Sequence, residues 1–174
     1  MAKAEGKRVL LIIAPENFRD EELFRTQEIL DDAGAQTEIA CSRKGEITGA
    51  LGGKAEATLT LNDVNTVDFD AIVFIGGSGA TVYFDDQTAH QIAKDGLSQG
   101  KILAAICIAP VTLANAGLLK GRKATCFQTE AESLKVKGAI YTGKEVEVDG
   151  KIITASGPTT AASFGNAIAE ALED

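Results

Sequence analysis

The sequence predicts an α/β protein whose doubly wound, mainly parallel sheet carries helices on both faces. Continuous apolar runs of strand length recur at 8–14, 71–75 and 101–106, and such runs indicate strands buried on both sides. A segment with helical periodicity comes after each run. Strands that alternate with helices form a parallel sheet through right-handed crossovers.

The first half of the chain begins with the strand at 8–14. A helix is expected from Asp20 to Ala33, because apolar residues recur there at helical spacing and Gly34 stands where a C-terminal cap belongs. Residues 36–41 form the second expected strand. The glycine-rich stretch 45–60 predicts a hairpin outside the main sheet.

The second half resumes with the strand at 71–75 and a helix from about 86 to 99. The strand at 101–106 runs directly into Cys107, and another helix is expected to about Ala116. Short strands are then predicted at 123–127, at 139–142 and on both sides of Asp149-Gly150, a strong hairpin signal. A helix over 160–172 closes the chain. No linker or repeat interrupts residues 1–174, so a single domain is expected.

Charge and composition exclude some classes of partner. The chain has 25 acidic and 17 basic residues and a formal net charge of -8, which would repel nucleic acid and an anionic membrane surface. It has no apolar run of about 18 residues and no signal-peptide pattern, so we expect a cytoplasmic location. Three cysteines without a CxxC spacing are expected to be free thiols there.

Cys107 is the principal candidate for chemistry. A buried strand gives way there, without loop residues, to a helix that opens Ile108-Ala109-Pro110. This turn would lift the thiol above backbone N–H groups that favour thiolate, as in a nucleophile elbow. The alternative is a small buried hydrophobic residue, a common role of free cysteine. Cys41 and Cys126 lack such surroundings and are expected to be packing residues.

Glu22 is the second candidate, because helical spacing places it on the inward stripe of the first helix, at the same sheet edge as Cys107. Burial beside a thiolate would raise the pKa of this carboxyl and keep it protonated. The alternative is an acidic first turn that complements the helix dipole. Asp20 and Glu21 are expected to face solvent or to cap the helix.

Gly76-Gly77 ends the strand at 71–75 and could supply a backbone N–H opposite that of Ile108 to bind an oxyanion. Glycines at strand ends more often only turn the chain, and this spacing is not a dinucleotide-binding fingerprint. His90, the only histidine, is expected to be a bystander in a helix. We therefore expect no metal site and no cofactor.

Three segments together resemble the ThiJ/PfpI superfamily: Asn17–Leu23, Phe69–Gly77 and Ala104–Pro110, with a further likeness in Ile152–Pro158. The resemblance covers about residues 7–172. It implies a flavodoxin-like sheet, Cys107 at the elbow with Glu22 as its carboxyl partner, and Gly77 and Ile108 as backbone donors. It also implies a homodimer.

The sequence departs from the family pattern at three positions. Ile108 stands where the protease-like branch has histidine, Phe127 where the glyoxalase or deglycase branch commonly has histidine, and Ser156 where arginine is frequent. Mechanisms that need a histidine are therefore doubtful, and peptidase activity is not expected.

Three functions remain open. The first is a stress-related protein whose oxidation-sensitive Cys107 is supported by Glu22. The second is an enzyme of the glyoxalase, deglycase or hydrolase type, in which Cys107 attacks a small carbonyl compound or other electrophile and Glu22 shuttles the proton. The third is a chaperone-like homo-oligomer.

Overall fold

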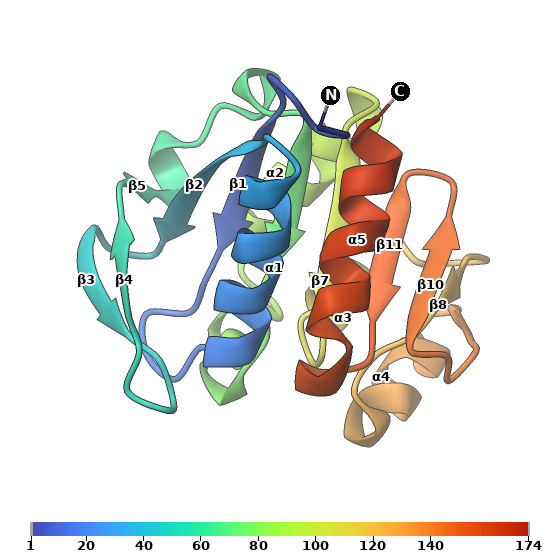
Figure 1. The fold of residues 1–174 in the computed structure, drawn as a ribbon. Coiled ribbons are helices and arrows are strands. Elements are labelled where there is room, and N and C mark those ends of the chain that lie inside the picture. The colour runs from blue at the N-terminus through green and yellow to red at the C-terminus, as the bar shows by residue number, and fades with distance from the viewer. Residues whose placement is uncertain (1, 174) are drawn as a thin grey trace.

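A seven-stranded sheet runs through the middle of the molecule, flanked by helices on both faces (Figure 1). The computed structural model describes residues 2–173. The strands are β1 (Arg8–Ile12), β2 (Gln36–Cys41), β3 (Gly45–Thr48), β4 (Lys54–Ala57), β5 (Leu59–Thr60), β6 (Ala71–Phe74), β7 (Ile102–Ile106), β8 (Lys123–Ala124), β9 (Ile140–Tyr141), β10 (Val146–Asp149) and β11 (Ile152–Ala155). The α-helices are α1 (Asp20–Asp32), α2 (Gln87–Ser98), α3 (Pro110–Asn115), α4 (Ala131–Val136) and α5 (Ala161–Leu172).

The order of the large sheet is β10-β11-β7-β6-β1-β2-β5, and β10 alone among its described strands is antiparallel to its neighbour. The run β2-β1-β6-β7-β11 is the flavodoxin-like order, with its switch point between β1 and β6. The predicted fold class is thereby confirmed. The hairpin expected at 45–60 is also confirmed, because β3 and β4 pair outside the large sheet.

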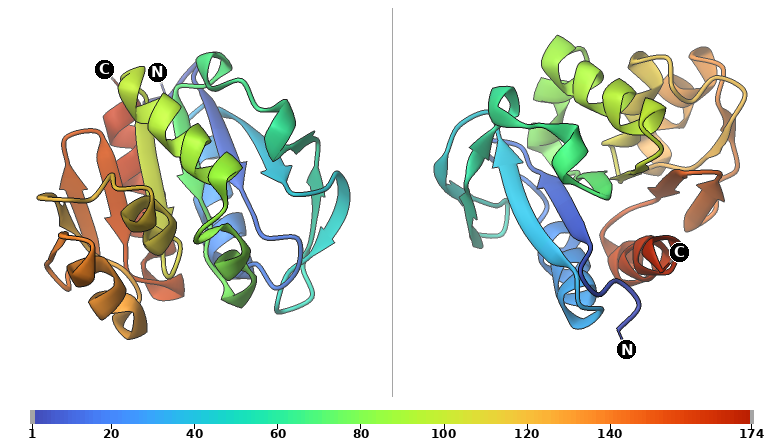
Figure 2. Two further views of the ribbon diagram at one scale, coloured as in Figure 1. Left: turned by 180° about the vertical axis from the view of Figure 1, so that it is seen from behind. Right: turned by 90° about the horizontal axis from the view of Figure 1, so that it is seen from above.

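The central strands separate two apolar cores. Leu11 of β1 contributes to the core under α1 and α5, whereas its neighbour Leu10 contributes to the core on the other face. Figures 1 and 2 show α1 and α5 side by side on one face and α2 and α3 on the other. Adjacent strand residues point to opposite faces, which explains the uninterrupted apolar runs. Helices α1 and α5 meet closely, since a Cβ on Gly165 would lie 2.9 Å from Cβ of Ile29.

Two elements differ from the sequence-based prediction. The helix expected directly after Cys107 begins only at Pro110, because Pro suits the first helical position and a turn precedes it. The strand expected over 123–127 ends at Ala124, since the N–H of Thr125 binds the hydroxyl of Thr154 at 2.9 Å instead of continuing a strand ladder. Helix α4 was not anticipated from the sequence.

The carboxyl ends of β1, β6, β7 and β11 meet at the lower edge of the sheet in Figure 1, and both chain ends lie at the upper edge. Loops at this carboxyl edge carry the candidate residues. Within residues 2–173, every helix is too short or too polar to cross a membrane.

Candidate functional site

Cys107 follows β7 in a backbone conformation that is rare for a residue with a side chain. Its φ is 66°, in the left-handed region. Its N–H donates to the carbonyl of Ala155 at 2.9 Å, and its own carbonyl accepts the N–H of Phe127 at 2.7 Å. Contacts on both sides hold this conformation, and such strain concentrates at functional sites. The turn has the geometry of a nucleophile elbow.

Glu22 lies in the first turn of α1 and is 0% exposed. Its Oε1 accepts the N–H of Gly76 at 2.9 Å. Its Oε2 has no hydrogen-bond partner among the described residues, and the thiol of Cys107 is the titratable group that acts on the carboxyl most strongly. The acidic residue that helical spacing placed inward is therefore inside the molecule and beside Cys107.

Gly76 is the point at which the two side chains meet. A Cβ on this residue would lie 2.5 Å from Oε1 of Glu22, 2.7 Å from Cβ of Cys107 and 2.8 Å from the carbonyl oxygen of Ile106. Gly77 follows with φ 108°, a conformation that glycine adopts without strain. The two glycines thus allow the loop after β6 to approach α1 and the elbow.

Burial dominates the electrostatics of the pair. It raises the pKa of Glu22 to about 7, although the neighbouring Cys107 thiol and the Gly76 N–H act in the opposite direction. Burial likewise raises the pKa of Cys107, and the negative charge of Glu22 raises it further, whereas the backbone N–H groups of Ile108 and Gly77 lower it. The pair therefore retains one proton above about pH 7, and its titration belongs to the coupled pair and not to either group alone.

This balance corrects one expectation. The sequence predicted a thiol pKa below that of a free cysteine, because Cys107 was expected over a helix N-terminus and beside a neutral carboxyl donor. Helix α3 begins three positions later, at Pro110, and the two backbone N–H groups do not outweigh burial. The feature that distinguishes Cys107 is its coupling to Glu22.

The remaining candidates lie outside this pair. Cys41 and Cys126 are buried at 0% and 1% exposure. Nε2 of His90 on α2 lies 2.8 Å from the carbonyl oxygen of Phe84. Within residues 2–173, no cluster of three or more His, Cys, Asp or Glu side chains could hold a metal ion.

Phe127 and Ser156, two of the positions that depart from the family pattern, line a pocket of about 510 Å³. The N–H of Phe127 binds the Cys107 carbonyl, so this pocket adjoins the elbow. Its other lining residues are Cys126, Gln128, Tyr141, Gly143, Gly157, Pro158 and Thr159, none of which carries a full charge at neutral pH.

Asp20 differs from its predicted role. It was expected to face solvent or to cap α1, yet it is only 8% exposed, and its two oxygens accept the N–H groups of Leu51 and Gly53. Glu21 matches the expectation, since it is exposed and pairs with Arg19 at 2.7 Å. The partners of Asp20 lie in the glycine-rich segment 49–53. No local sequence pattern indicates that this segment contacts Asp20.

Gly76→Ala is expected to lower the free energy of unfolding by about 2 kcal/mol, because the added methyl group overpacks a full site. Its three close neighbours include a backbone carbonyl, which cannot move away as a flexible side chain would. Urea unfolding at equilibrium measures the change. The comparison variant is Gly100→Ala, which has open space around the new Cβ but a left-handed φ. Any loss of stability in that variant comes from backbone strain and not from overpacking. Equal stability of Gly76→Ala and the wild type would contradict the packing described here.

Comparisons with known proteins show which proteins this chain resembles. The model of the DJ-1/PfpI family matches residues 7–171. Uncharacterized protein MJ0967 of Methanocaldococcus jannaschii is 43% identical over 172 residues, which are 97% of this chain and 84% of the relative. Deglycase PfpI of Pyrococcus furiosus is 34% identical over 149 residues, 86% of this chain and 90% of the relative.

A third relative is the glutathione-independent glyoxalase DJR-1.2 of Caenorhabditis elegans. It is 29% identical over 170 residues, which are 98% of this chain and 91% of the relative. Among solved structures, a ThiJ/PfpI domain protein from Brachyspira murdochii superposes with a TM-score of 0.94 at 34% identity, covering 97% of each chain.

Proposed function

The chain belongs to the DJ-1/PfpI family, and from that membership we propose a stress-related protein whose reactive Cys107, supported by buried Glu22, takes up oxidants and small electrophiles in the cytosol. One observation carries the proposal. A cysteine held at φ 66° is coupled to a carboxyl whose pKa burial raises to about 7. Two groups that share one proton near neutral pH can form a thiolate beside a carboxylic acid.

The reactive state in this proposal carries the charge on sulfur. In that state the thiolate has the N–H groups of Gly77 and Ile108 within reach, and protonated Oε2 of Glu22 can donate to it as well. In the opposite state the carboxylate has the Gly76 N–H and only a weak S–H donor. The thiolate is the nucleophilic form of cysteine.

Oxidation by hydrogen peroxide follows from this state. The thiolate attacks one peroxide oxygen, an S–O bond forms and the O–O bond breaks. The departing hydroxide takes the proton of Glu22 and leaves as water. Sulfur has lost two electrons to the peroxide, Cys107 has become a sulfenic acid, and Glu22 is a carboxylate. A second peroxide would give the sulfinic acid.

Mass spectrometry of peptides from peroxide-treated protein tests the proposal. Added oxygen is expected on Cys107 before Cys41 or Cys126, and Glu22→Gln is expected to slow the step because it removes the proton donor. Oxygen spread equally over the three cysteines would reject the proposal. So would equal rates in the wild type and Glu22→Gln.

A second candidate is favoured by the deglycase and glyoxalase relatives. Here the Cys107 thiolate adds to the carbon of a small aldehyde, and a C–S bond forms while the carbonyl electrons move to oxygen. The N–H groups of Gly77 and Ile108 would hold this oxyanion, which then takes the proton of Glu22. Fast loss of methylglyoxal that depends on Cys107 would make this the main function.

No meaningful peptidase activity is expected. A cysteine that cleaves a peptide normally relies on a histidine to protonate the departing amine. Ile108 and Phe127 occupy the positions where the family resemblance would place one, and His90 is engaged with Phe84. Casein and fluorogenic peptides are the substrates for the assay, with Cys107→Ser as the control for contaminating enzymes. Cleavage at ordinary protease rates that vanishes in Cys107→Ser would overturn this expectation.

We also propose a homodimer, as the family resemblance implies. The β3–β4 hairpin offers a surface outside the large sheet, and Leu51 at its tip is 64% exposed. Sedimentation at micromolar concentration is expected to give about twice the 18.1 kDa mass of the chain. A single species at the mass of one chain would reject the dimer.

A further inference from the structure

The tip of the β3–β4 hairpin is attached to the first turn of α1 through Asp20. Oδ1 of this residue accepts the N–H of Leu51 at 2.8 Å, and Oδ2 accepts the N–H of Gly53 at 2.7 Å. Asp20 is only 8% exposed. A charged side chain rarely lies inside a protein unless its partners compensate for lost hydration. These two hydrogen bonds are therefore the reason that Asp20 can be buried.

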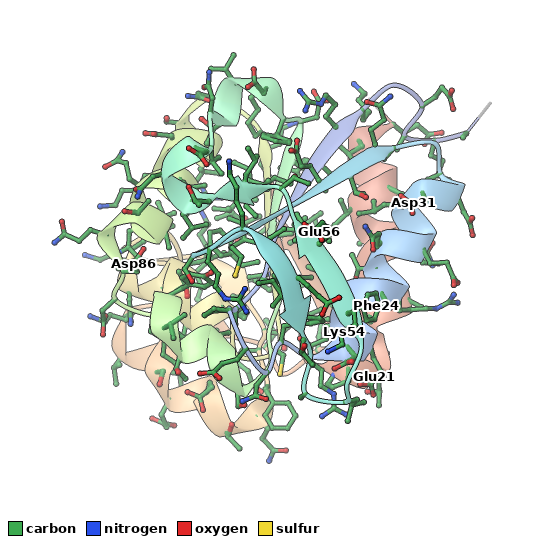
Figure 3. All side chains as sticks on the ribbon, turned by 90° about the vertical axis from the view of Figure 1, so that its left-hand side faces the viewer. Glu21, Phe24, Asp31, Lys54, Glu56 and Asp86 are labelled. Atoms are coloured by element: carbon green, nitrogen blue, oxygen red, sulfur yellow. The ribbon has the colours of Figure 1, made fainter. Side chains whose placement is uncertain are left out.

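The hairpin tip fits closely around Asp20. A Cβ on Gly49 would lie 2.5 Å from Oδ1, and one on Gly53 would lie 2.5 Å from Oδ2. The N–H of Ala50 adds a bond to the carbonyl of Phe18 at 2.9 Å. Figure 3 looks onto this side of the molecule, where Lys54 of β4 and Phe24 of α1 line the same pocket.

The same turn of α1 is attached to the site on its other side. The N–H of Arg19 donates to the carbonyl of Gly76 at 2.9 Å, and the N–H of Gly76 donates to Oε1 of Glu22 at 2.9 Å. Asp20 and Glu22 are thus two residues apart on one turn, between the hairpin tip and the loop after β6. A displacement of this turn moves the carboxyl of Glu22 relative to Cys107.

We infer that Asp20 is a positioning residue, which fixes Glu22 against Cys107 by tying the first turn of α1 to the hairpin tip. This inference rests on the proposed function of the Cys107–Glu22 pair. Asp20 itself touches no reacting atom and acts only through the turn that it anchors. The charged or titratable groups that act on Glu22 are Cys107 at the elbow and Arg19 and Glu21 on its own segment.

The test compares the pH profiles of Cys107 alkylation by iodoacetamide. Asp20→Asn places an NH₂ group against a backbone N–H, so one of the two hydrogen bonds is lost. The profile is expected to move toward that of Glu22→Gln. At about pH 7 the alkylation rate of Cys107 is expected to change by about tenfold. At metal sites, removing a residue that orients a ligand changes affinity or activity by about 10- to 100-fold, and the lower value is taken here.

Two further variants isolate the cause. Gly49→Ala pushes on the Asp20 carboxylate from the hairpin and keeps every charge, so it should move the profile in the same direction as Asp20→Asn. It also decides the question if Asp20→Asn does not fold, since Gly49 has an ordinary backbone conformation. Asp86→Asn is the charge control. Asp86 caps α2 by accepting the Ala89 N–H at 2.8 Å, and asparagine is an equally good cap. Asp86 lies well apart from Glu21 in Figure 3.

The outcomes separate the inference from the function on which it rests. If Glu22→Gln differs from the wild type while Asp20→Asn and Gly49→Ala both coincide with it, Asp20 is not a positioning residue and the proposed pair stands. A shift in Asp86→Asn as large as that in Asp20→Asn would also overturn the inference, because it would reflect net charge. If Glu22→Gln itself coincides with the wild type, the proposed function fails.

Discussion

Iodoacetamide is expected to modify Cys107 at least about 100-fold faster than Cys41 or Cys126 at about pH 8, because thiolate content and access together set the rate. In the proposed function the thiolate of Cys107 forms when its proton passes to Glu22. Cys107 is 8% exposed, whereas Cys126 and Cys41 are 1% and 0% exposed, so iodoacetamide has better access to Cys107.

Peptide mass spectrometry over a time course gives the three rates separately. Cys107→Ser should leave only the slow modification of the other two cysteines. The same protein unfolded in urea supplies the reference, in which all three thiols should react at similar rates. If Cys107 reacts no faster than Cys41 or Cys126 in the folded protein, the elbow does not activate it.

The sheet could be predicted from the sequence because its central strands are buried on both faces. The buried stretches in the middle of the sheet contain no polar residue: Val9 to Ile12, Ala71 to Phe74 and Ile102 to Ile106. The region after Gly117 gave a weaker signal, because β8 and β9 have two residues each. Two residues are too few to show the alternation of apolar and polar side chains that predicts a strand. Hydrogen bonds to side chains distant in the sequence, such as that of Thr125 to Thr154, determine where such a strand ends.

The partnership of Cys107 and Glu22 could be predicted because both residues follow strands that end at one edge of a parallel sheet. The role of Asp20 could not. Its partners, Leu51 and Gly53, lie more than thirty residues along the chain, and nothing local in the sequence fixes where the hairpin tip folds back. The pKa of Cys107 was misjudged for a related reason, since the start of α3 and the burial of the elbow depend on tertiary packing.

Glu22→Gln is expected to gain stability relative to the wild type as the pH rises. Burial raises the pKa of Glu22 from 4.5 to about 7, so between these values the folded state binds more protons than the unfolded state. Stability of the wild type contributed by this group therefore falls as pH rises from about 4.5 to about 7 and is constant on either side. A glutamine at this position does not titrate, so the variant lacks this loss.

The expected size follows from the same two values. One unit of pKa difference corresponds to about 1.4 kcal/mol, so the advantage of Glu22→Gln over the wild type should grow by about 3 kcal/mol between about pH 4 and about pH 8. Comparing the two pH values cancels any constant packing cost of the amide. Urea unfolding of both proteins at each pH gives the free energies, and Glu21→Gln, at an exposed carboxyl on the same turn, is the matched control. An advantage that does not change with pH would mean that Glu22 ionises in the folded protein as readily as in the unfolded chain. Glu22 would then hold no proton near neutral pH for the reaction proposed at Cys107.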